Sequence, residues 1–133
     1  MEFIMKKILL AITVGVTLFG YSVSAFDEGD NKKLLETGNC MGCDLAESNL
    51  PSSGLKGANL EGANLAMANL EGADLEGVNL KDANLEGANL AGANLKGANL
   101  EGVNLKEANL EGVDLRGLNL GSANLEGVNL AGV

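Results

Sequence analysis

The sequence has no histidine and no tryptophan, and it contains one proline, two cysteines and 3% aromatic residues. Without histidine, the chain lacks the side chain that most often serves in acid–base catalysis and in zinc binding. The scarcity of aromatic rings predicts an interior of Leu, Ala and Val, which suits a narrow and regular core. We therefore expect neither an enzyme nor a cofactor.

The charge is one-sided, with a formal net charge of −9 at pH 7. This charge excludes a strongly basic nucleic-acid-binding surface. An acidic balance favours solubility, or a partner with a basic surface. We expect an unknown protein partner and no nucleic acid.

Residues 1–25 have the pattern of a secretory signal peptide. Met5-Lys6-Lys7 is a short basic region, residues 8–20 are mostly apolar, and Val23-Ser24-Ala25 supplies the small residues of a cleavage site. Cleavage after Ala25 predicts a periplasmic or secreted protein that has no membrane segment. The alternative is a membrane anchor formed by uncleaved residues 8–25, which approach the lower length limit for a span.

Residues 43–133 repeat a five-residue unit. Leu occupies every fifth position from Leu45 to Leu130. The residue two before each Leu is small or branched, the residue just before it is Asn or Asp except at Gly54, and the residue two after it is usually Gly. We expect the Leu side chains to form the inward core, represented by Leu45, Leu60, Leu80, Leu100 and Leu120.

A period of five fits neither regular secondary structure. Five residues on an α-helix advance about 500°, so successive Leu side chains would wander around the axis. On a strand, odd spacing would send them to alternate faces. A coil that turns a corner every five residues fits instead, because Asn and Gly suit corners and stacked coils satisfy each other's backbone groups.

The pattern A(N/D)LXX, repeated through residues 43–133, resembles the pentapeptide-repeat family. The resemblance implies an all-β fold: a right-handed quadrilateral β-helix with five residues on each side. The central Leu and the small residue two before it would both point inward. We expect about four and a half coils, stacked at the ordinary spacing of β-strands.

Charged residues alternate in sign along the columns that such a coil would create. Residues twenty apart would be vertical neighbours, and opposite charges are favourable there. The only like-charged pair is Lys96 with Arg116. Opposite charges follow each other in three columns: Lys56, Glu76 and Lys96; Glu61, Lys81 and Glu101; Glu86, Lys106 and Glu126. The alternation supports the twenty-residue coil and predicts stacked charge pairs that specify register rather than supply much stability.

Residues 26–42 precede the repeat and are predicted to form an N-terminal cap. Asp30 or Asn31 can begin a short helix that runs through residues 32–37 and ends at Gly38. Leu34 and Leu35 would then cover the first coil, since an open solenoid end exposes a hydrophobic edge. A charged functional arm is the rival interpretation.

Cys40 and Cys43 form a C-x-x-C motif at the first corner. Cys43 holds the inward position two before Leu45, and Cys40 extends the Leu register by one place. Two cysteines without histidine are too few for the usual zinc site, so we expect no metal. A structural disulfide suits an exported protein, and two reduced, buried thiols or a redox or metal role are the alternatives.

These features predict an exported, non-catalytic repeat scaffold for protein binding or structural stacking. The C-terminal coil has inward Leu130 and Val133 at its end, which suggests a homodimer through that coil. The alternative function is an acidic DNA mimic that binds a type II topoisomerase, as some family members do, but basic residues interrupt the acidic columns. Two irregularities stand out: Met67 replaces an outward Gly, and Leu118 occupies an inward position where Ala or Val is usual.

Overall fold

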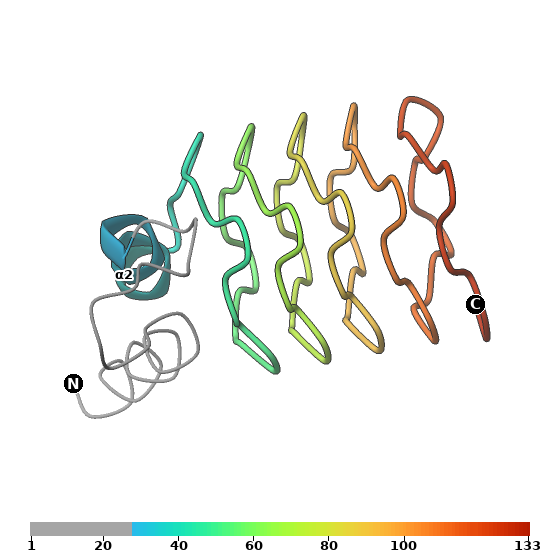
Figure 1. Ribbon diagram of the computed structural model, residues 1–133, viewed down its shortest axis with the longest axis horizontal. Helices are drawn as coiled ribbons and strands as arrows, with labels where there is room; N and C mark the ends of the chain where they lie inside the picture. Colours follow the sequence, from blue (N-terminus) through green and yellow to red (C-terminus); the bar gives the residue numbers. More distant parts are fainter. Residues whose placement is uncertain (1–27) are drawn as a thin grey trace.

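The computed structural model describes residues 28–133, in which one α-helix is followed by a stack of coils (Figure 1). Helix α2 spans Glu28–Thr37 and has Glu28 and Asp30 in its first turn, where carboxylates interact favourably with the helix dipole. It ends at Gly38, which has a φ of 67° and donates its N–H to the carbonyl of Leu34 at 2.8 Å. The predicted signal peptide lies outside the described residues.

Helix α2 lies at the N-terminal end of the stack (Figure 1). Leu34 is 1% exposed and belongs to the hydrophobic core, and Leu35 is partly buried against it. The predicted helix began four residues later than the observed one. The helix therefore sits where a cover for the first coil was expected.

Parallel bridges join residues that are twenty positions apart, which establishes the length of a coil. The first pair is Asn39 with Asn59, and the last is Asn109 with Asn129. From Leu45 to Leu90, the N–H of each central Leu donates to the carbonyl of the Asn or Asp in the next coil, as Leu60 does to Asn79 at 2.8 Å. Within residues 28–133 these bridges are isolated and no continuous strand is assigned, because a turn interrupts the chain every five residues.

The corners are β-turns that have a positive φ at their third residue, except at Ser122 in the last coil. At one corner Ala58 donates its N–H to the carbonyl of Leu55 at 2.9 Å, and Gly57 has a φ of 68°. Lys56, the second turn residue, is not among the residues with positive φ. This combination corresponds to a type II turn, in which Gly is favoured at the third position. The Gly of the repeat therefore provides the bend.

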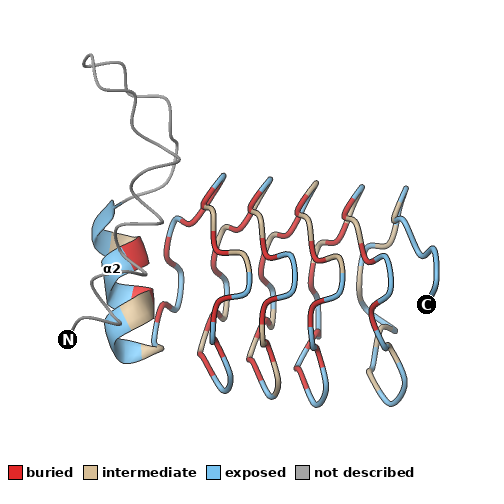
Figure 2. Ribbon diagram, turned by 90° about the horizontal axis from the view of Figure 1, so that it is seen from below, coloured by how far each residue is buried: buried red, intermediate tan, exposed pale blue. Residues whose placement is uncertain are grey.

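The core consists of the central Leu side chains and the small residues two before them (Figure 2). Leu45, Leu60 and Leu80 are 0% exposed, and Leu100 is 2% exposed. Leu120 differs, because it is only partly buried. Burial is therefore lower in the C-terminal coil. Residues 114–133 are all intermediate or exposed, whereas the preceding coils contain buried residues throughout (Figure 2).

Candidate functional site: the outer columns of the rod

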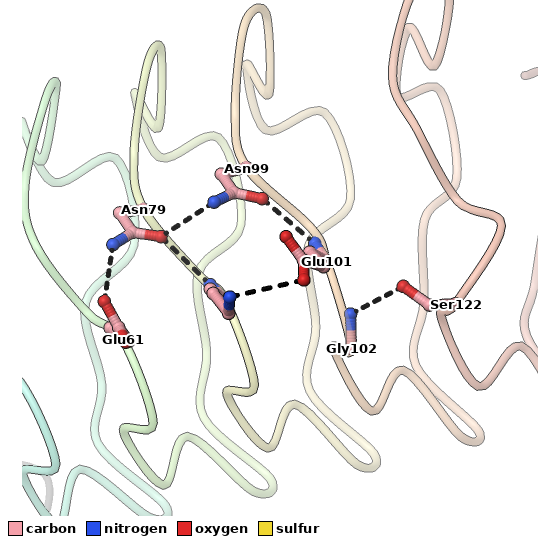
Figure 3. Close-up of polar contacts among 7 residues, drawn as sticks. Glu61, Asn79, Asn99, Glu101, Gly102 and Ser122 are labelled. Carbon is pink, nitrogen blue, oxygen red and sulfur yellow. Dashed lines mark hydrogen bonds and ion pairs between the residues drawn. The ribbon is translucent and has the colours of Figure 1, made fainter.

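Side-chain amides of Asn stack along the outer sides of the rod. Asn79 donates its Nδ2 proton to Oδ1 of Asn59 at 3.2 Å. Asn99 donates in the same way to Asn79 at 3.3 Å (Figure 3). The same Oδ1 of Asn79 accepts the backbone N–H of Lys81 at 3.2 Å. The Asn side chains therefore tie each corner to its neighbours, and much of their hydrogen-bonding capacity is used within the protein.

Three of the predicted charge pairs form ion pairs, and all have the Lys on the earlier coil. Lys56 contacts Glu76 at 3.2 Å and Lys81 contacts Glu101 at 3.2 Å. Lys106 contacts Glu126 at 3.8 Å. The hydrogen bond to Glu101 raises the pKa of Lys81. These pairs are exposed to solvent, so each contributes little stability.

In two of the three predicted pairs in which the Glu comes first, its carboxylate binds an Asn amide instead of the Lys. Glu61 accepts a hydrogen bond from Nδ2 of Asn79 at 3.1 Å (Figure 3), and Glu86 accepts one from Asn104 at 3.4 Å. The carboxylates of Glu61 and Glu86 thus bind an Asn amide of the next coil rather than the expected Lys. In the column of Lys56 and Glu76, Lys96 makes no ion pair within residues 28–133.

Non-glycine residues occupy five corner positions that require a positive φ. They are Glu47, Ser52, Met67, Asp82 and Glu107, with φ between 53° and 60°. The most apolar of them, Met67, is 64% exposed, and its Sδ lies where a Cβ on Gly87 would be. Left-handed backbone is unfavourable for such a side chain. The Gly in the next coil leaves room for it.

A disulfide joins Cys40 and Cys43 at the first corner, three residues apart in sequence. Both are nearly fully buried. Helix α2 contacts the same corner, because Sγ of Cys40 lies 3.2 Å from the carbonyl oxygen of Asp30. The Asp30 carboxylate also accepts the backbone N–H of Asp44 at 2.8 Å. The cysteines and the helix thus form one closed N-terminal end; no group of three or more potential metal ligands occurs in residues 28–133.

The regular stack is interrupted on two adjacent sides of the last coil. Bridges between residues 94 and 114 and between residues 99 and 119 are missing from the series, which resumes at Asn104 with Asn124. Residues 114–120 are exposed or only partly buried. In Figure 1 the C-terminal coil is drawn with a different outline from the preceding coils. A hollow beside this segment is lined by residues 112–116 and by Gly132 and Val133.

Arg116 binds within its own turn at this interruption. Its guanidinium contacts the Asp114 carboxylate, with Nη2 at 2.6 Å from Oδ2 and Nε at 2.9 Å from Oδ1. The hydrogen bonds from the Arg116 side chain lower the pKa of Asp114 to about 2. Sequence reasoning did not select Asp114. The signal that could have found this site was the single like-charged pair, Lys96 with Arg116, together with Leu118 in a position for small residues.

The chain belongs to the pentapeptide-repeat family. The sequence profile described as pentapeptide repeats matches eight copies in four overlapping ranges, residues 39–77, 68–107, 79–117 and 93–132. The resemblance seen in the repeat unit is thereby confirmed, and membership implies a right-handed quadrilateral β-helix and a scaffold rather than a catalytic fold. The register of residues twenty apart agrees with such a helix.

Several solved structures are similar to this chain. The pentapeptide repeat protein Rfr23 from the cyanobacterium Cyanothece 51142 is 35% identical, over 78% of this chain and 91% of its own, with a TM-score of 0.42. A pentapeptide repeat protein from Nostoc PCC 7120 is 32% identical, over 69% of this chain and 84% of its own, with a TM-score of 0.45. One from the Arabidopsis thaliana thylakoid lumen is 28% identical, over 79% and 70%, with a TM-score of 0.38. No curated protein matches significantly.

Proposed function

We propose that the protein is an exported scaffold that binds another protein through the outer surface of its rod. The observation that carries this proposal is the filled interior, in which Leu75, Leu80 and Leu85 are all 0% exposed. A rod packed with Leu along its axis offers no enclosed pocket there for a small molecule. Its outer columns and its two ends are therefore the surfaces available for binding.

Export is supported by the signal-like residues 1–25 and by the cysteines. Disulfides persist mainly in oxidising compartments, and both cysteines of the chain are joined to each other. Among residues 28–133, no helix has the length and hydropathy needed to cross a bilayer. We propose a periplasmic or secreted protein that begins at Phe26 after cleavage.

Structural stacking is a second candidate, favoured by the exposed apolar residues of the last coil. Leu130 is 47% exposed and Val133 is 55% exposed. Apolar coil ends pair readily with another copy of the same edge. A homodimer through this coil would cover both side chains. DNA mimicry has less support, because Lys56, Lys81 and Lys106 interrupt the acidic surface.

The test is affinity capture from the periplasm with tagged residues 26–133, using variants in which one charge column is inverted. The triple variant Glu61→Lys, Lys81→Glu, Glu101→Lys reverses the surface pattern while it keeps opposite charges adjacent. Inverting the column of Lys56, Glu76 and Lys96 gives a matched control on another side. We expect one variant to lose a specific partner that the other keeps. Recovery of nothing except the protein itself would favour stacking and contradict the scaffold.

Export is tested separately by the mass of the chain purified from the periplasm. We expect a species that begins at Phe26. A full-length chain found only in the membrane fraction would instead support an anchor formed by residues 8–25. This result would leave the binding test unaffected, so the two parts of the proposal fail independently.

A further inference from the structure

The interruption in the last coil leaves an unpaired backbone edge on the coil before it. In the regular stack, the N–H groups of residues such as Leu75, Gly77 and Leu80 donate to the next coil. The equivalent N–H groups of Leu95, Gly97 and Leu100 have no backbone acceptor, and the carbonyls of Ala93 and Ala98 receive no donor from the next coil. We call residues 93–100 the open edge.

The sequence explains why the chain departs from the stack at this place. Leu118 falls in the column of Ala58, Val78 and Ala98, where the larger side chain has to fit above Ala98. Overpacking of this kind displaces backbone. Arg116 falls directly above Lys96, and like charges on neighbouring strands are unfavourable. Both irregularities therefore act against the closure of the same two sides.

The coils meet again beside the open edge, so its limits are defined. Gly102 donates its N–H to Oγ of Ser122 at 2.9 Å (Figure 3). Regular pairing then returns with Asn124, whose N–H donates to the carbonyl of Val103 at 3.0 Å. On the other side, Leu110 still donates to Asn129 at 2.9 Å. The loss of backbone pairing is thus confined to the two sides of the last coil where the bridges to residues 114 and 119 are missing. The rest of the last coil remains paired with the coil before it.

We propose that the open edge binds an extended segment of a partner protein by parallel strand addition, with an acidic side chain opposite Lys96. This inference rests on the proposed role in protein binding and names the surface and the chemistry of the partner. Backbone donors and acceptors supply affinity in such complexes, and side chains supply selectivity. Here three N–H groups and two carbonyls lack backbone partners. Gly97 is exposed, whereas Leu95 and Leu100 are 2% exposed, so the added segment would displace the residues of the last coil that cover them.

Charge complementarity selects an acidic segment. Along this column the charges run Lys56, Glu76, Lys96, and the next residue is Arg116 rather than an acid. A Glu on the added strand would lie next to Lys96 and would continue the alternation. Lys96 is free to respond, because it makes no ion pair within the described chain. Small and Leu-like residues would flank that Glu, since Leu115 and Leu120 cover the core only partly.

The chain itself supplies a matched pair of probe peptides. Ala58–Leu65 reads ANLEGANL, and Ala93–Leu100 reads ANLKGANL, so the two differ only in Glu61 against Lys96. Each peptide, with blocked ends, would be titrated into ¹⁵N-labelled residues 26–133 and followed by amide chemical shifts. We expect the Glu peptide to shift Leu95, Gly97 and Leu100, to slow their hydrogen exchange, and to leave the paired amides of Leu75 and Gly77 unchanged.

The Lys peptide should bind about two- to fivefold more weakly, which is the range for one exposed charge pair. Added salt should reduce the difference between the peptides. Equal affinity for the two peptides would overturn the charge assignment. No binding of either peptide at millimolar concentration would overturn the open edge as a docking site.

A variant that closes the coil is the control on the protein side. The double change Arg116→Glu and Leu118→Ala places an acid above Lys96 and a small residue above Ala98. We expect slower exchange of the Leu95, Gly97 and Leu100 amides in the free variant, and at least tenfold weaker binding of the Glu peptide. Unchanged binding to this variant would contradict the proposal.

Two further outcomes separate this inference from the proposed function. If the unmodified protein alone sediments as a dimer with these three amides already protected, the occupant is a second copy, and a foreign acidic segment is excluded. If affinity capture recovers a partner that binds the closed variant equally well, the scaffold role stands and the open edge is wrong. Loss of that partner from the closed variant and from the variant that inverts Lys56, Glu76 and Lys96 supports the open edge, provided that the variant that inverts Glu61, Lys81 and Glu101 keeps the partner.

Discussion

Replacing Gly87 by Ala tests whether the corner glycines leave room for a side chain of the preceding coil. Gly87 has a φ of 66°, and an added Cβ would overlap Sδ of Met67. Gly92 has nearly the same φ, 65°, but nothing lies within 4 Å of a Cβ built there. The two substitutions therefore share the backbone strain and differ in the contact with Met67.

The expected magnitudes follow from these two costs. A left-handed conformation costs an L-residue about 1 kcal/mol, so Gly92→Ala should lower the free energy of unfolding by that amount. Gly87→Ala adds the displacement of a flexible Met side chain from its rotamer, which costs about 1 kcal/mol more. We therefore expect a loss of about 2 kcal/mol for Gly87→Ala.

Urea denaturation followed by far-UV circular dichroism provides the measurement, because the chain has no Trp and its single Tyr, Tyr21, lies in the predicted signal peptide. A double-mutant cycle with Met67→Gly isolates the contact. In that background Gly87→Ala should cost no more than Gly92→Ala does. If Gly87→Ala and Gly92→Ala are equally destabilising in the unmodified protein, or if Met67→Gly gives no relief, our account of this corner is refuted.

Three other predictions concern the core, the first corner and the last coil. Leu75→Ala should lower the free energy of unfolding by about 2–5 kcal/mol, as expected for a fully buried Leu. Leu120→Ala should cost less than half as much in the same urea experiment. Equal losses would contradict the partial burial of Leu120. Replacing both Cys40 and Cys43 by Ala should cost about 2 kcal/mol in urea denaturation, the loop-closure contribution of so short a ring; an unchanged midpoint would show that the disulfide adds no stability. The Asp114 carboxyl should titrate with a pKa of about 2 by NMR, against an ordinary value of 3.8, and Arg116→Gln should return this pKa toward the ordinary value. Because the pKa is lowered in the folded protein, the ionised carboxylate stabilises the fold above pH 4. This stabilisation is lost as the pH falls toward 2.

Much of the fold could be predicted from the sequence because one constraint recurs in each unit. A Leu at every fifth place has to face one interior, and the sign alternation of Lys56, Glu76 and Lys96 makes a twenty-residue coil recognisable without coordinates. The structure has bridges at this spacing. The roles of Asn and Gly at the corners were also accessible, because turn chemistry depends on local residues.

The direction of side chains and the open edge could not be predicted in the same way. Column position alone predicts a pair of Glu61 with Lys81, but the Glu61 carboxylate accepts a hydrogen bond from the Asn79 amide. The position of that amide depends on how far neighbouring coils are offset. In the sequence, Leu118 is only an inward residue larger than the usual Ala or Val, and in the structure it packs partly buried against the core. The effect of Leu118 on the backbone pairing of the coils depends on Ala98 in the preceding coil and on the charge of Arg116. Such combined effects are not additive.

The closed first corner gives the rod a direction of growth. Helix α2 and the Cys40–Cys43 disulfide complete one end, and each later coil accepts the amide protons of the coil before it. Chains are synthesised from the N-terminus, so every new turn of twenty residues meets a finished surface that fixes its register. Errors would then accumulate only toward the last turn, where the chain already tolerates a departure from the pattern.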